Sequence, residues 1–248
     1  MKINIKKNIF NKNGFLILKK IFSNNEIINI LNELENIKKK VATQKNRKYQ
    51  HKTNDGKINT IHNIQEFYKS KTIMKIINKK KLIFILSNLL EGKIRMRNLE
   101  FFLKPKRSGL ATPFHQDNFY WNFAEGKALN VWLACSSSSK KNGGLCYLKG
   151  SHKLGTINHK LSFKKGSSQM IPKNILNKLT FKKIFPKLKK GDCLIHDSEI
   201  IHGSEKNYSD ENRVGLTISY ASSKAKIDII KLRRYKNNLK KNLEKLYD

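Results

Sequence analysis

The chain has 248 residues, of which 38% are hydrophobic, and its 52 lysine and arginine residues outnumber its 18 aspartate and glutamate residues. This length and apolar share fit one domain with a sizeable core, and no apolar run approaches the roughly 18 residues of a membrane span, which excludes a membrane partner from our expectations. The net charge of +34 is not localised, because lysine, asparagine and isoleucine are enriched from end to end, as in proteins of AT-rich genomes. We therefore do not predict nucleic acid as the partner, although the charge would steer small anionic substrates towards the protein.

Residues 1–92 are expected to form a helical buttress for the rest of a single domain. Within them, residues 14–18 are predicted to form a short strand, and Ser23 with Glu26 gives a capping-box pattern at the start of a helix. The apolar positions that follow recur on one helical stripe, which predicts a helix that packs against the domain.

Residues 42–60 are polar and basic, and they lack the apolar periodicity of a helix or a strand. We predict a mobile loop there and interpret it as a lid. Apolar residues return between positions 64 and 90, where we expect further helix.

Beyond residue 93 the pattern changes to short apolar or alternating runs punctuated by glycine, proline and asparagine, which is typical of strands. Strands and helices do not alternate, and the chain has no glycine-rich phosphate loop, which argues against a doubly wound sheet. We expect a mainly β protein with flanking helices, in which residues 93–222 form a double-stranded β-helix, the cupin-like jelly-roll barrel. The predicted strands are residues 94–103, 128–135, 145–148, 193–196 and 214–220.

Two segments are expected to carry substrate choice, because loops at the mouth of a rigid barrel are where binding specificity usually resides. Residues 118–127 are rich in aromatic side chains, which either pack against the apolar part of a substrate or form a hydrophobic hinge. Residues 156–190 form a long basic insertion between two predicted strands. After the core, residues 223–248 show the stripe of a basic amphipathic helix, which we expect to pack onto the barrel.

The cysteines and the first residues bear on the cellular compartment. Cys135, Cys146 and Cys193 form no Cys-x-x-Cys pair and show no metal-ligand spacing, so we expect them to be small buried hydrophobes. The start of the chain carries neither the apolar stretch nor the small-residue cleavage site of a secretory signal. Both observations predict a cytoplasmic protein in a reducing compartment.

The most informative residues are His115, Asp117, His202 and Arg213. In an extended strand, residues two apart project from the same face, so His115 and Asp117 can reach one ion, and a second strand would supply His202. Two imidazoles and one carboxylate leave other positions of an octahedral ion free, which is the 2-His-1-carboxylate arrangement of non-haem Fe(II) oxygenases. Alone, a His-x-Asp triplet is a weak motif, and Arg213 alone is more often a surface charge.

These residues lie in a set of short stretches with a fixed order and spacing. The stretches are residues 113–117 (PFHQD), 143–153 (GGLCYLKGSHK), 191–192 (GD) and 201–204 (IHGS), followed by Arg213. The set resembles the phytanoyl-CoA dioxygenase family of Fe(II)- and 2-oxoglutarate-dependent enzymes. The resemblance is clearest across residues 96–222, with a weaker likeness across residues 10–34, and it implies the same double-stranded β-helix fold.

The resemblance also implies roles for individual residues. It makes His115, Asp117 and His202 the iron ligands. It makes Arg213, eleven residues past His202, the partner of the distal carboxylate of 2-oxoglutarate, a role that suits a planar guanidinium because its fork matches a carboxylate and stays charged.

Two further residues fall at positions that the family uses for the cosubstrate. Trp132 lies where relatives place an aromatic side chain lining the 2-oxoglutarate pocket, and Ser204 lies where a hydroxyl helps to bind the carboxylate. A tryptophan in a strand is, on its own, more often simply part of the core. Both assignments therefore depend on the metal ligands.

The other histidines are expected to be structural. His196 is the alternative ligand, because even spacing can place it on the same strand face as His202. We prefer His202, because it carries the Gly-Ser that follows the ligand in the family. His152 lies in a turn, where we expect it to bond to the backbone. Loop positions in polar surroundings are predicted for His51, His62 and His159.

Together these features predict a dioxygenase that uses Fe(II), 2-oxoglutarate and O2 to hydroxylate an unactivated C–H bond of a small organic substrate, with release of succinate and CO2. The resemblance favours hydroxylation over halogenation, because halogenating relatives replace the carboxylate that this chain keeps as Asp117. Two alternatives stay open. A non-redox cupin-like isomerase or binding protein would form no succinate, and a basic nucleic-acid-binding protein would lose affinity steeply with salt.

Overall fold

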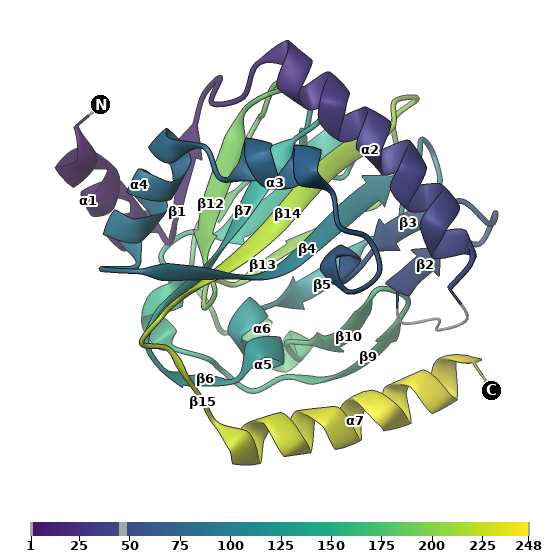
Figure 1. Ribbon diagram of the computed structural model, residues 1–248. Helices are drawn as coiled ribbons and strands as arrows, with labels where there is room; N and C mark the ends of the chain where they lie inside the picture. The colour runs from purple at the N-terminus through teal and green to yellow at the C-terminus, as the bar shows by residue number, and fades with distance from the viewer. Residues whose placement is uncertain (1, 45–48, 248) are drawn as a thin grey trace.

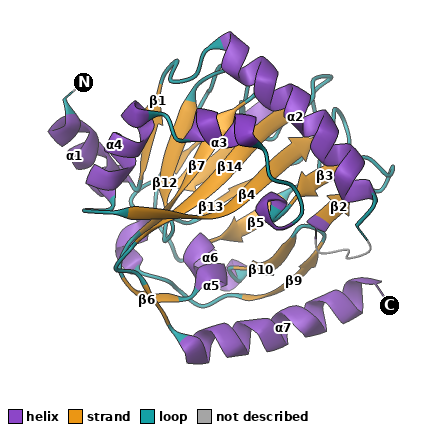
Figure 2. Cartoon of the chain, in the orientation of Figure 1, coloured by secondary structure: helices purple, strands orange, loops and turns teal. Residues whose placement is uncertain are grey.

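Antiparallel strands form the centre of the computed structural model, which describes residues 2–44 and 49–247 (Figure 2). The larger sheet has the strand order β1 (Phe15–Leu18), β12 (Cys193–Asp197), β7 (Ala128–Ala134), β14 (Arg213–Ser222), β4 (Ile94–Lys104), β3 (Ile58–Ile61) and β2 (Gln50–Lys52). The smaller sheet has the order β11 (Lys183–Ile184), β8 (Leu145–Leu148), β13 (His202–Ser204) and β5 (Thr112–His115).

The two sheets face each other across a small core. Phe15, Trp132 and Leu194 of the larger sheet pack in one cluster with Tyr147 of the smaller sheet. This arrangement confirms the predicted jelly-roll class, but the two sheets remain open and do not close into a barrel. The space between them is where the candidate site lies.

Two additional strand pairs lie outside the main sheets. One is a hairpin of β9 (Lys160–Lys164) and β10 (Ser167–Met170), and the other pairs β6 (Phe123–Glu125) with β15 (Lys226–Ile227). Gly166 has a φ of +75° in the turn of the hairpin, a conformation that glycine adopts without steric cost. The hairpin packs against β5, which is the edge strand of the smaller sheet, and thereby covers that edge.

Helices cover the outer face of the larger sheet (Figure 1). The helices of this layer are α1 (Ile3–Asn13), α2 (Asn24–Ala42), α3 (Lys71–Ile77) and α4 (Lys80–Leu89). The shorter helices are α5 (Asp117–Trp121) and α6 (Lys173–Leu176), with the 3-10 turns η2 (Ile64–Glu66), η3 (Lys140–Asn142) and η4 (Ser151–Leu154). The last helix, α7 (Ile229–Tyr247), runs beneath β9 and β10 on the opposite side of the molecule from α2 and α3.

Helix α2 shows how the sequence specifies this layer. Ser23 Oγ accepts the N–H of Glu26, and the Glu26 carboxylate accepts the N–H of Ser23, which is the predicted capping box. The buried side chains of α2 lie on one stripe and pack with α3, α4 and the larger sheet in the main core. Each fully buried aliphatic side chain contributes about 1.5–3 kcal/mol, so this layer holds the sheet in place behind the site.

Three expectations about loops are wrong. Residues 42–60 were expected as a mobile lid, but β2 and β3 lie there and extend the larger sheet at its edge, with Thr60 opposite Phe102. Residues 45–48 lie outside the described residues. Residues 156–190 contain the β9–β10 hairpin, α6 and β11, and residues 118–127 contain most of α5 and all of β6. These strands have two to five residues each, too few for an alternating pattern to stand out.

The remaining elements agree with the sequence more closely. The five predicted long strands correspond to β4, β7, β8, β12 and β14 within two residues at each end. All three cysteines are buried and free of disulfides, as predicted. Among the described residues, none of the helices combines the length and the apolar character that crossing a membrane requires.

Candidate metal centre and its cavity

Two histidines meet across a pair of short strands in the smaller sheet. β13 pairs antiparallel with β5, and the register places His202 opposite His115. Directly opposite residues in such a pair project from the same face with Cβ atoms about 5 Å apart, and the two imidazole ring centroids lie 4.3 Å apart. His202 therefore comes from a second strand, as the sequence predicts.

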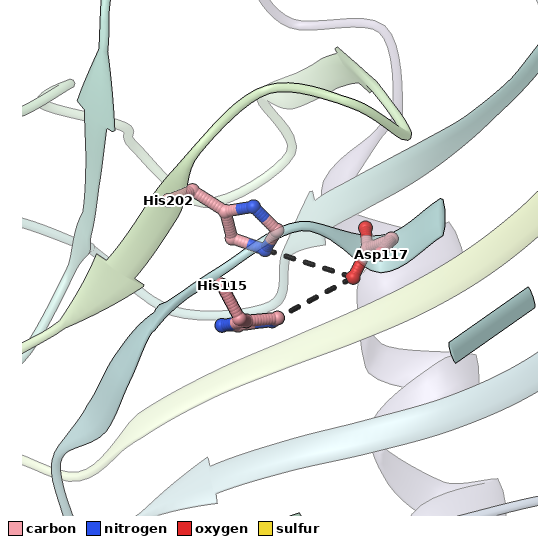
Figure 3. A group of neighbouring side chains, drawn as sticks. All are labelled: His115, Asp117 and His202. Carbon is pink, nitrogen blue, oxygen red and sulfur yellow. Dashed lines mark ion pairs between the residues drawn. The ribbon is translucent and has the colours of Figure 1, made fainter. Parts of the chain in front are cut away.

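Asp117 begins α5, so the prediction that it shares a strand with His115 is wrong. Gln116 keeps an extended backbone, with φ −124° and ψ 134°, and this still directs the side chains of residues 115 and 117 to one side. Asp117 Oδ1 lies 3.6 Å from His115 Nε2 and 3.8 Å from His202 Nε2 (Figure 3). Helix α5 begins at residue 117 because the carboxylate of an aspartate interacts favourably with the free N–H groups at a helix N-terminus.

The distances between the three side chains suit ligation of one divalent metal ion better than direct hydrogen bonds between them. The two distances to Asp117 exceed those of a hydrogen bond, whereas two metal–ligand bonds of about 2.1 Å each span up to about 4.2 Å. His115 Nδ1 donates to the carbonyl oxygen of Pro113 at 2.8 Å, and His202 Nδ1 donates to that of Ile200 at 3.0 Å. Both Nε2 atoms are therefore left unprotonated, as metal ligation requires. All three ligand atoms lie within 4.8 Å of one another.

The second oxygen of Asp117 is held by two side chains that the sequence analysis did not place in the site. Oδ2 accepts hydrogen bonds from Asn130 Nδ2 at 2.5 Å and from His196 Nε2 at 3.0 Å. Tyr147 donates its hydroxyl to His196 Nδ1 at 2.9 Å. His196, the alternative ligand, thus lies behind Asp117 and orients it. One signal was present in the sequence, because Asn130 is a polar residue within an otherwise apolar strand.

The protonation states of Asp117 and His202 also suit metal binding. Burial alone would raise the pKa of Asp117, but the imidazoles of His202 and His196 beside it hold it well below its usual range. Burial, together with repulsion from His115, lowers the pKa of His202 to about 3. Asp117 is therefore ionised and His202 is neutral near pH 7, which are the protonation states that bind a metal.

A buried guanidinium lies in the same cavity. Arg213, at the start of β14, is only 2% exposed, and its Cζ lies 5.3 Å from the centre of the Trp132 ring. Burial lowers its pKa to about 9, which leaves it charged at neutral pH. Its Nε has no hydrogen-bond partner among the described residues. A buried cation without a counter-ion is costly, so this group fits an anionic ligand.

Lys104 lies opposite Arg213 in the register of β4 and β14, and the sequence analysis missed it. Its Nζ donates to Ser204 Oγ at 2.6 Å and also to the carbonyl oxygen of Glu205. Burial first, and then repulsion from Arg213, lowers the pKa of Lys104 well below its usual range. No sequence pattern marks a lysine at a strand end as buried, since lysines are abundant throughout this chain.

One cavity of about 380 Å³ joins these groups. All six residues that the sequence predicts for the site line it, namely His115, Asp117, His202, Trp132, Ser204 and Arg213. His51, expected in a loop, lies on the edge strand β2, whereas His62 lies in the loop that follows β3, as expected; both line the cavity. The small edge strands that the sequence concealed are the reason for this error.

The remaining histidines are structural. His159 accepts the N–H of Gln116 at its Nε2, 3.0 Å away, and its ring stacks on Phe119 with the centroids 4.2 Å apart. It lies in a loop, as expected, and supports the backbone between the two ligands His115 and Asp117. His152 Nε2 donates to the carbonyl oxygen of Asn11 at 3.1 Å, as expected for a histidine that bonds to backbone.

Comparison with known proteins agrees with this geometry. The model of the family described as phytanoyl-CoA dioxygenase (PhyH) matches residues 10–215. The chain belongs to the phytanoyl-CoA dioxygenase family. A relative from Stutzerimonas stutzeri, named "probable alpha-ketoglutarate-dependent hypophosphite dioxygenase", is 24% identical over 86% of this chain and 76% of its own length. The human protein "Phytanoyl-CoA dioxygenase, peroxisomal" is 23% identical over 88% of this chain and 68% of its own length.

Solved structures share the fold of this family member. EctD from S. alaskensis, solved with 2-oxoglutarate and 5-hydroxyectoine, has a TM-score of 0.74 at 19% identity, covering 90% of this chain and 77% of EctD. The epimerase SnoN from nogalamycin biosynthesis, in complex with Fe3+, alpha ketoglutarate and nogalamycin RO, has a TM-score of 0.70 at 18% identity, covering 90% of this chain and 84% of SnoN. Family and fold together indicate an oxygenase-type enzyme that depends on iron and 2-oxoglutarate.

Proposed function

We propose that this protein uses Fe(II), 2-oxoglutarate and O2 to hydroxylate an unactivated C–H bond of a small organic substrate. The observation that carries the proposal is the convergence of His115, Asp117 and His202, whose ligand atoms lie within 4.8 Å of one another, in a cavity that also contains Arg213. In the balanced reaction, a C–H bond, 2-oxoglutarate and O2 give a C–OH group, succinate and CO2.

In this proposal the three ligands hold the iron in a fixed orientation. The carbonyl groups of Pro113 and Ile200 keep Nδ1 of each imidazole protonated, so both Nε2 atoms point to the ion. When bound, iron and 2-oxoglutarate supply the oxidising chemistry, and the protein supplies binding and orientation. Asp117 retains the third ligand position, which leaves no room for a halide there and favours hydroxylation over halogenation.

The cosubstrate is assigned to the end of the cavity formed by Arg213, Trp132 and Ser204. The Arg213 guanidinium would bind the distal carboxylate of 2-oxoglutarate with its planar fork, and its position over the Trp132 ring fixes that fork. Lys104 donates to the Ser204 hydroxyl and so holds it in place. Binding a carboxylate here neutralises the buried Arg213 guanidinium, whose Nε has no hydrogen-bond partner among the described residues.

A small substrate is part of the proposal because the cavity has to hold 2-oxoglutarate as well. The relative from Stutzerimonas stutzeri is named for hypophosphite, and the EctD structure contains 5-hydroxyectoine; both are small molecules. A cytoplasmic location remains our prediction, while the human relative is named peroxisomal.

The test is a turnover assay with protein that is loaded with Fe(II) under anaerobic conditions. Adding 2-oxoglutarate and O2 should give succinate and CO2 at a slow rate that rises when a substrate is present, and ¹⁸O2 should label the product hydroxyl. The reaction should require iron and oxygen and should stop in Asp117→Ala. The matched control is Asp210→Ala, because Asp210 is exposed and pairs only with Arg107 among the described residues.

Other outcomes would identify a different function. Turnover of a substrate without succinate would point to a non-redox isomerase. Succinate formation without ¹⁸O in the product would point to an epimerase or a cyclase and would contradict hydroxylation. Nucleic-acid binding that falls with salt and is unchanged in Asp117→Ala, with no succinate formed, would overturn the enzyme proposal.

A further inference from the structure

A second guanidinium lines the cavity outside the proposed 2-oxoglutarate site. Arg97 lies on β4, and its Cζ lies 4.9 Å from the centre of the Phe123 ring and 5.2 Å from that of the Trp121 ring. The two rings fix the plane of the guanidinium, because cations prefer the faces of aromatic rings. Arg97 Nη1 is buried and has no hydrogen-bond partner among the described residues. The guanidinium is thus held in a fixed orientation, while its Nη1 lacks a hydrogen-bond partner among the described residues.

The acidic groups nearby are engaged elsewhere. Glu100 also lines the cavity, but its Oε1 lies 2.9 Å from His62 Nδ1. Asp117 is held by Asn130 and His196 and faces the metal centre. Among the described residues, Arg97 therefore forms no direct ion pair and is affected by the charge of Glu100 only from a distance. A partly buried cation without a directly bonded anion is destabilising.

Arg97 lies close to the metal centre. Its ring partner Trp121 is the last residue of α5 and Asp117 is the first, which separates them by about 6 Å along the helix axis at 1.5 Å per residue. Two tyrosines also line the cavity: Tyr120 packs edge-on against His115 with centroids 5.6 Å apart, and Tyr235 packs edge-on against Tyr120 at 5.7 Å. A bound molecule can thus contact Arg97 and the tyrosines while it reaches the metal centre.

We propose that Arg97 binds an anionic oxygen-bearing group of the substrate, a carboxylate or a phosphonate, and that Tyr120 and Tyr235 form the wall against which the rest of the substrate packs. The inference rests on the proposed function and specifies its substrate class: a compact organic acid. Arg213 serves as the internal precedent, because it too lies over a tryptophan ring with a nitrogen that has no partner. 2-Oxoglutarate satisfies one guanidinium, and the substrate satisfies the other.

The size of the cavity and the origin of the tyrosine wall agree with a compact acid. Ligand pockets have volumes of about 300–1,000 Å³, so the 380 Å³ here, shared with 2-oxoglutarate, leaves room for a small molecule only. Tyr235 belongs to α7, which begins after the family match ends at residue 215. The wall is therefore formed in part by a segment that lies beyond the residues matched by the family model, as expected of a feature that sets specificity.

The chain provides a reporter for each guanidinium. It has two tryptophans, of which Trp132 lies beside Arg213 and Trp121 lies beside Arg97. The experiment is a fluorescence titration of the full chain, with Fe(II) and 2-oxoglutarate at saturation and oxygen excluded, so that Arg213 is already occupied. The probes are phenylacetate, phenylphosphonate and the neutral phenylacetamide.

The wild-type protein is expected to bind at least one of the two acids at least about tenfold more tightly than the amide, since a hydrogen bond to a charged group contributes more than a neutral one. Arg97→Gln should remove this preference while iron and 2-oxoglutarate affinities stay unchanged. Arg97→Lys keeps the charge but not the planar fork, so its preference for the acid over the amide should be intermediate between those of the wild type and Arg97→Gln. The matched control Arg95→Gln removes the same charge from an exposed position two residues away and should retain the preference.

Two results would overturn the inference. One is binding of the amide as tight as that of both acids, or no binding of any probe, by the wild-type protein. The other is an equal loss of acid binding in Arg97→Gln and Arg95→Gln, which would assign the effect to the general positive charge. Neither result concerns turnover, so a failure of the proposed function would be seen separately, as an absence of iron-dependent succinate formation in the wild-type protein.

Discussion

The cavity has a metal end, with His115, Asp117 and His202, and a substrate end, with Arg97, Tyr120 and Tyr235. The two ends are stabilised in different ways. At the metal end, the ligand side chains are fixed by groups of the protein itself: backbone carbonyls hold His115 and His202, and Asn130 and His196 hold Asp117. At the substrate end, Arg97 has a buried nitrogen without a partner. The comparison indicates that the metal end is preorganised for one chemistry, whereas the substrate end, in our proposal, is completed by its ligand.

The two ends also differ in their place in the fold. The metal end is built on paired strands of the two facing sheets, backed by the main core. The substrate end is closed by the β9–β10 hairpin and by α7, which packs against β9 and runs along the edge of the molecule (Figure 1). Changes at the substrate end should therefore leave the metal chemistry intact, and substitutions at each end can test that separation.

The largest effect is expected for Arg213→Leu. Removing one partner of a buried charge pair costs several kcal/mol, so the affinity for 2-oxoglutarate should fall on the order of a hundredfold or more, with iron binding retained. The measurement is a 2-oxoglutarate titration of the iron-loaded protein, with exposed Arg107→Leu as the control. An unchanged affinity would mean that Arg213 does not bind the cosubstrate.

A smaller effect is expected for His196→Leu, which removes one donor from the second oxygen of Asp117. Loss of a group that orients a metal ligand typically weakens metal affinity by about 10- to 100-fold. The measurement is an anaerobic Fe(II) titration, with His152→Gln as the control because His152 bonds to the backbone far along the chain at Asn11. Iron affinity equal to that of the wild type would show that Asp117 needs no such support.

Acid should weaken the support that His159 gives to the backbone at Gln116. Burial lowers the pKa of His159 to about 4 from its usual 6.5, so the unfolded chain takes up a proton at a higher pH than the folded one. The stability from this group is present above pH 6.5 and is lost as the pH falls towards 4, by about 2 kcal/mol at pH 5. Urea unfolding of the metal-free protein at pH 7.5 and 5 should show a smaller loss for His159→Gln; an equal loss would refute this assignment.

The smallest effect at the metal end is expected for Tyr235→Ala. The ring of Tyr235 packs against that of Tyr120 and, among the described residues, stacks on none of the three metal ligands. Iron and 2-oxoglutarate affinities should therefore change by no more than about twofold, within the range of a distant, additive substitution. Binding of the acidic probe should weaken. A tenfold loss of iron affinity would show that the two ends of the cavity are coupled.

The long strands and the capped helix could be predicted because their patterns extend over many residues. Strand β7 is apolar almost throughout, and Ser23 with Glu26 marks the start of α2 unambiguously. Helix α1 was missed, because Phe10 is its only fully buried side chain and no apolar stripe marks it. The short strands at the sheet edge were missed for a different reason: their pairing is a tertiary contact rather than a local pattern.

In the site, the resemblance to the family identified the residues that meet at the metal centre but not those that hold them. His196 and Asn130 face each other across β12 and β7, and that register is invisible without the paired strands. Arg97 and Lys104 were also missed, because 52 basic residues hide the few that are buried. Charge counts describe composition, whereas a missing counter-ion is visible only in three dimensions.

The central claim is that His115, Asp117 and His202 hold one iron. It is tested most directly by a crystal structure of the protein soaked anaerobically with Fe(II), with anomalous data collected at the iron edge. The account predicts a single strong peak about 2.0–2.2 Å from His115 Nε2, His202 Nε2 and an oxygen of Asp117. A peak located elsewhere, such as between His51 and His62, or the absence of a peak at the three ligands, would contradict it.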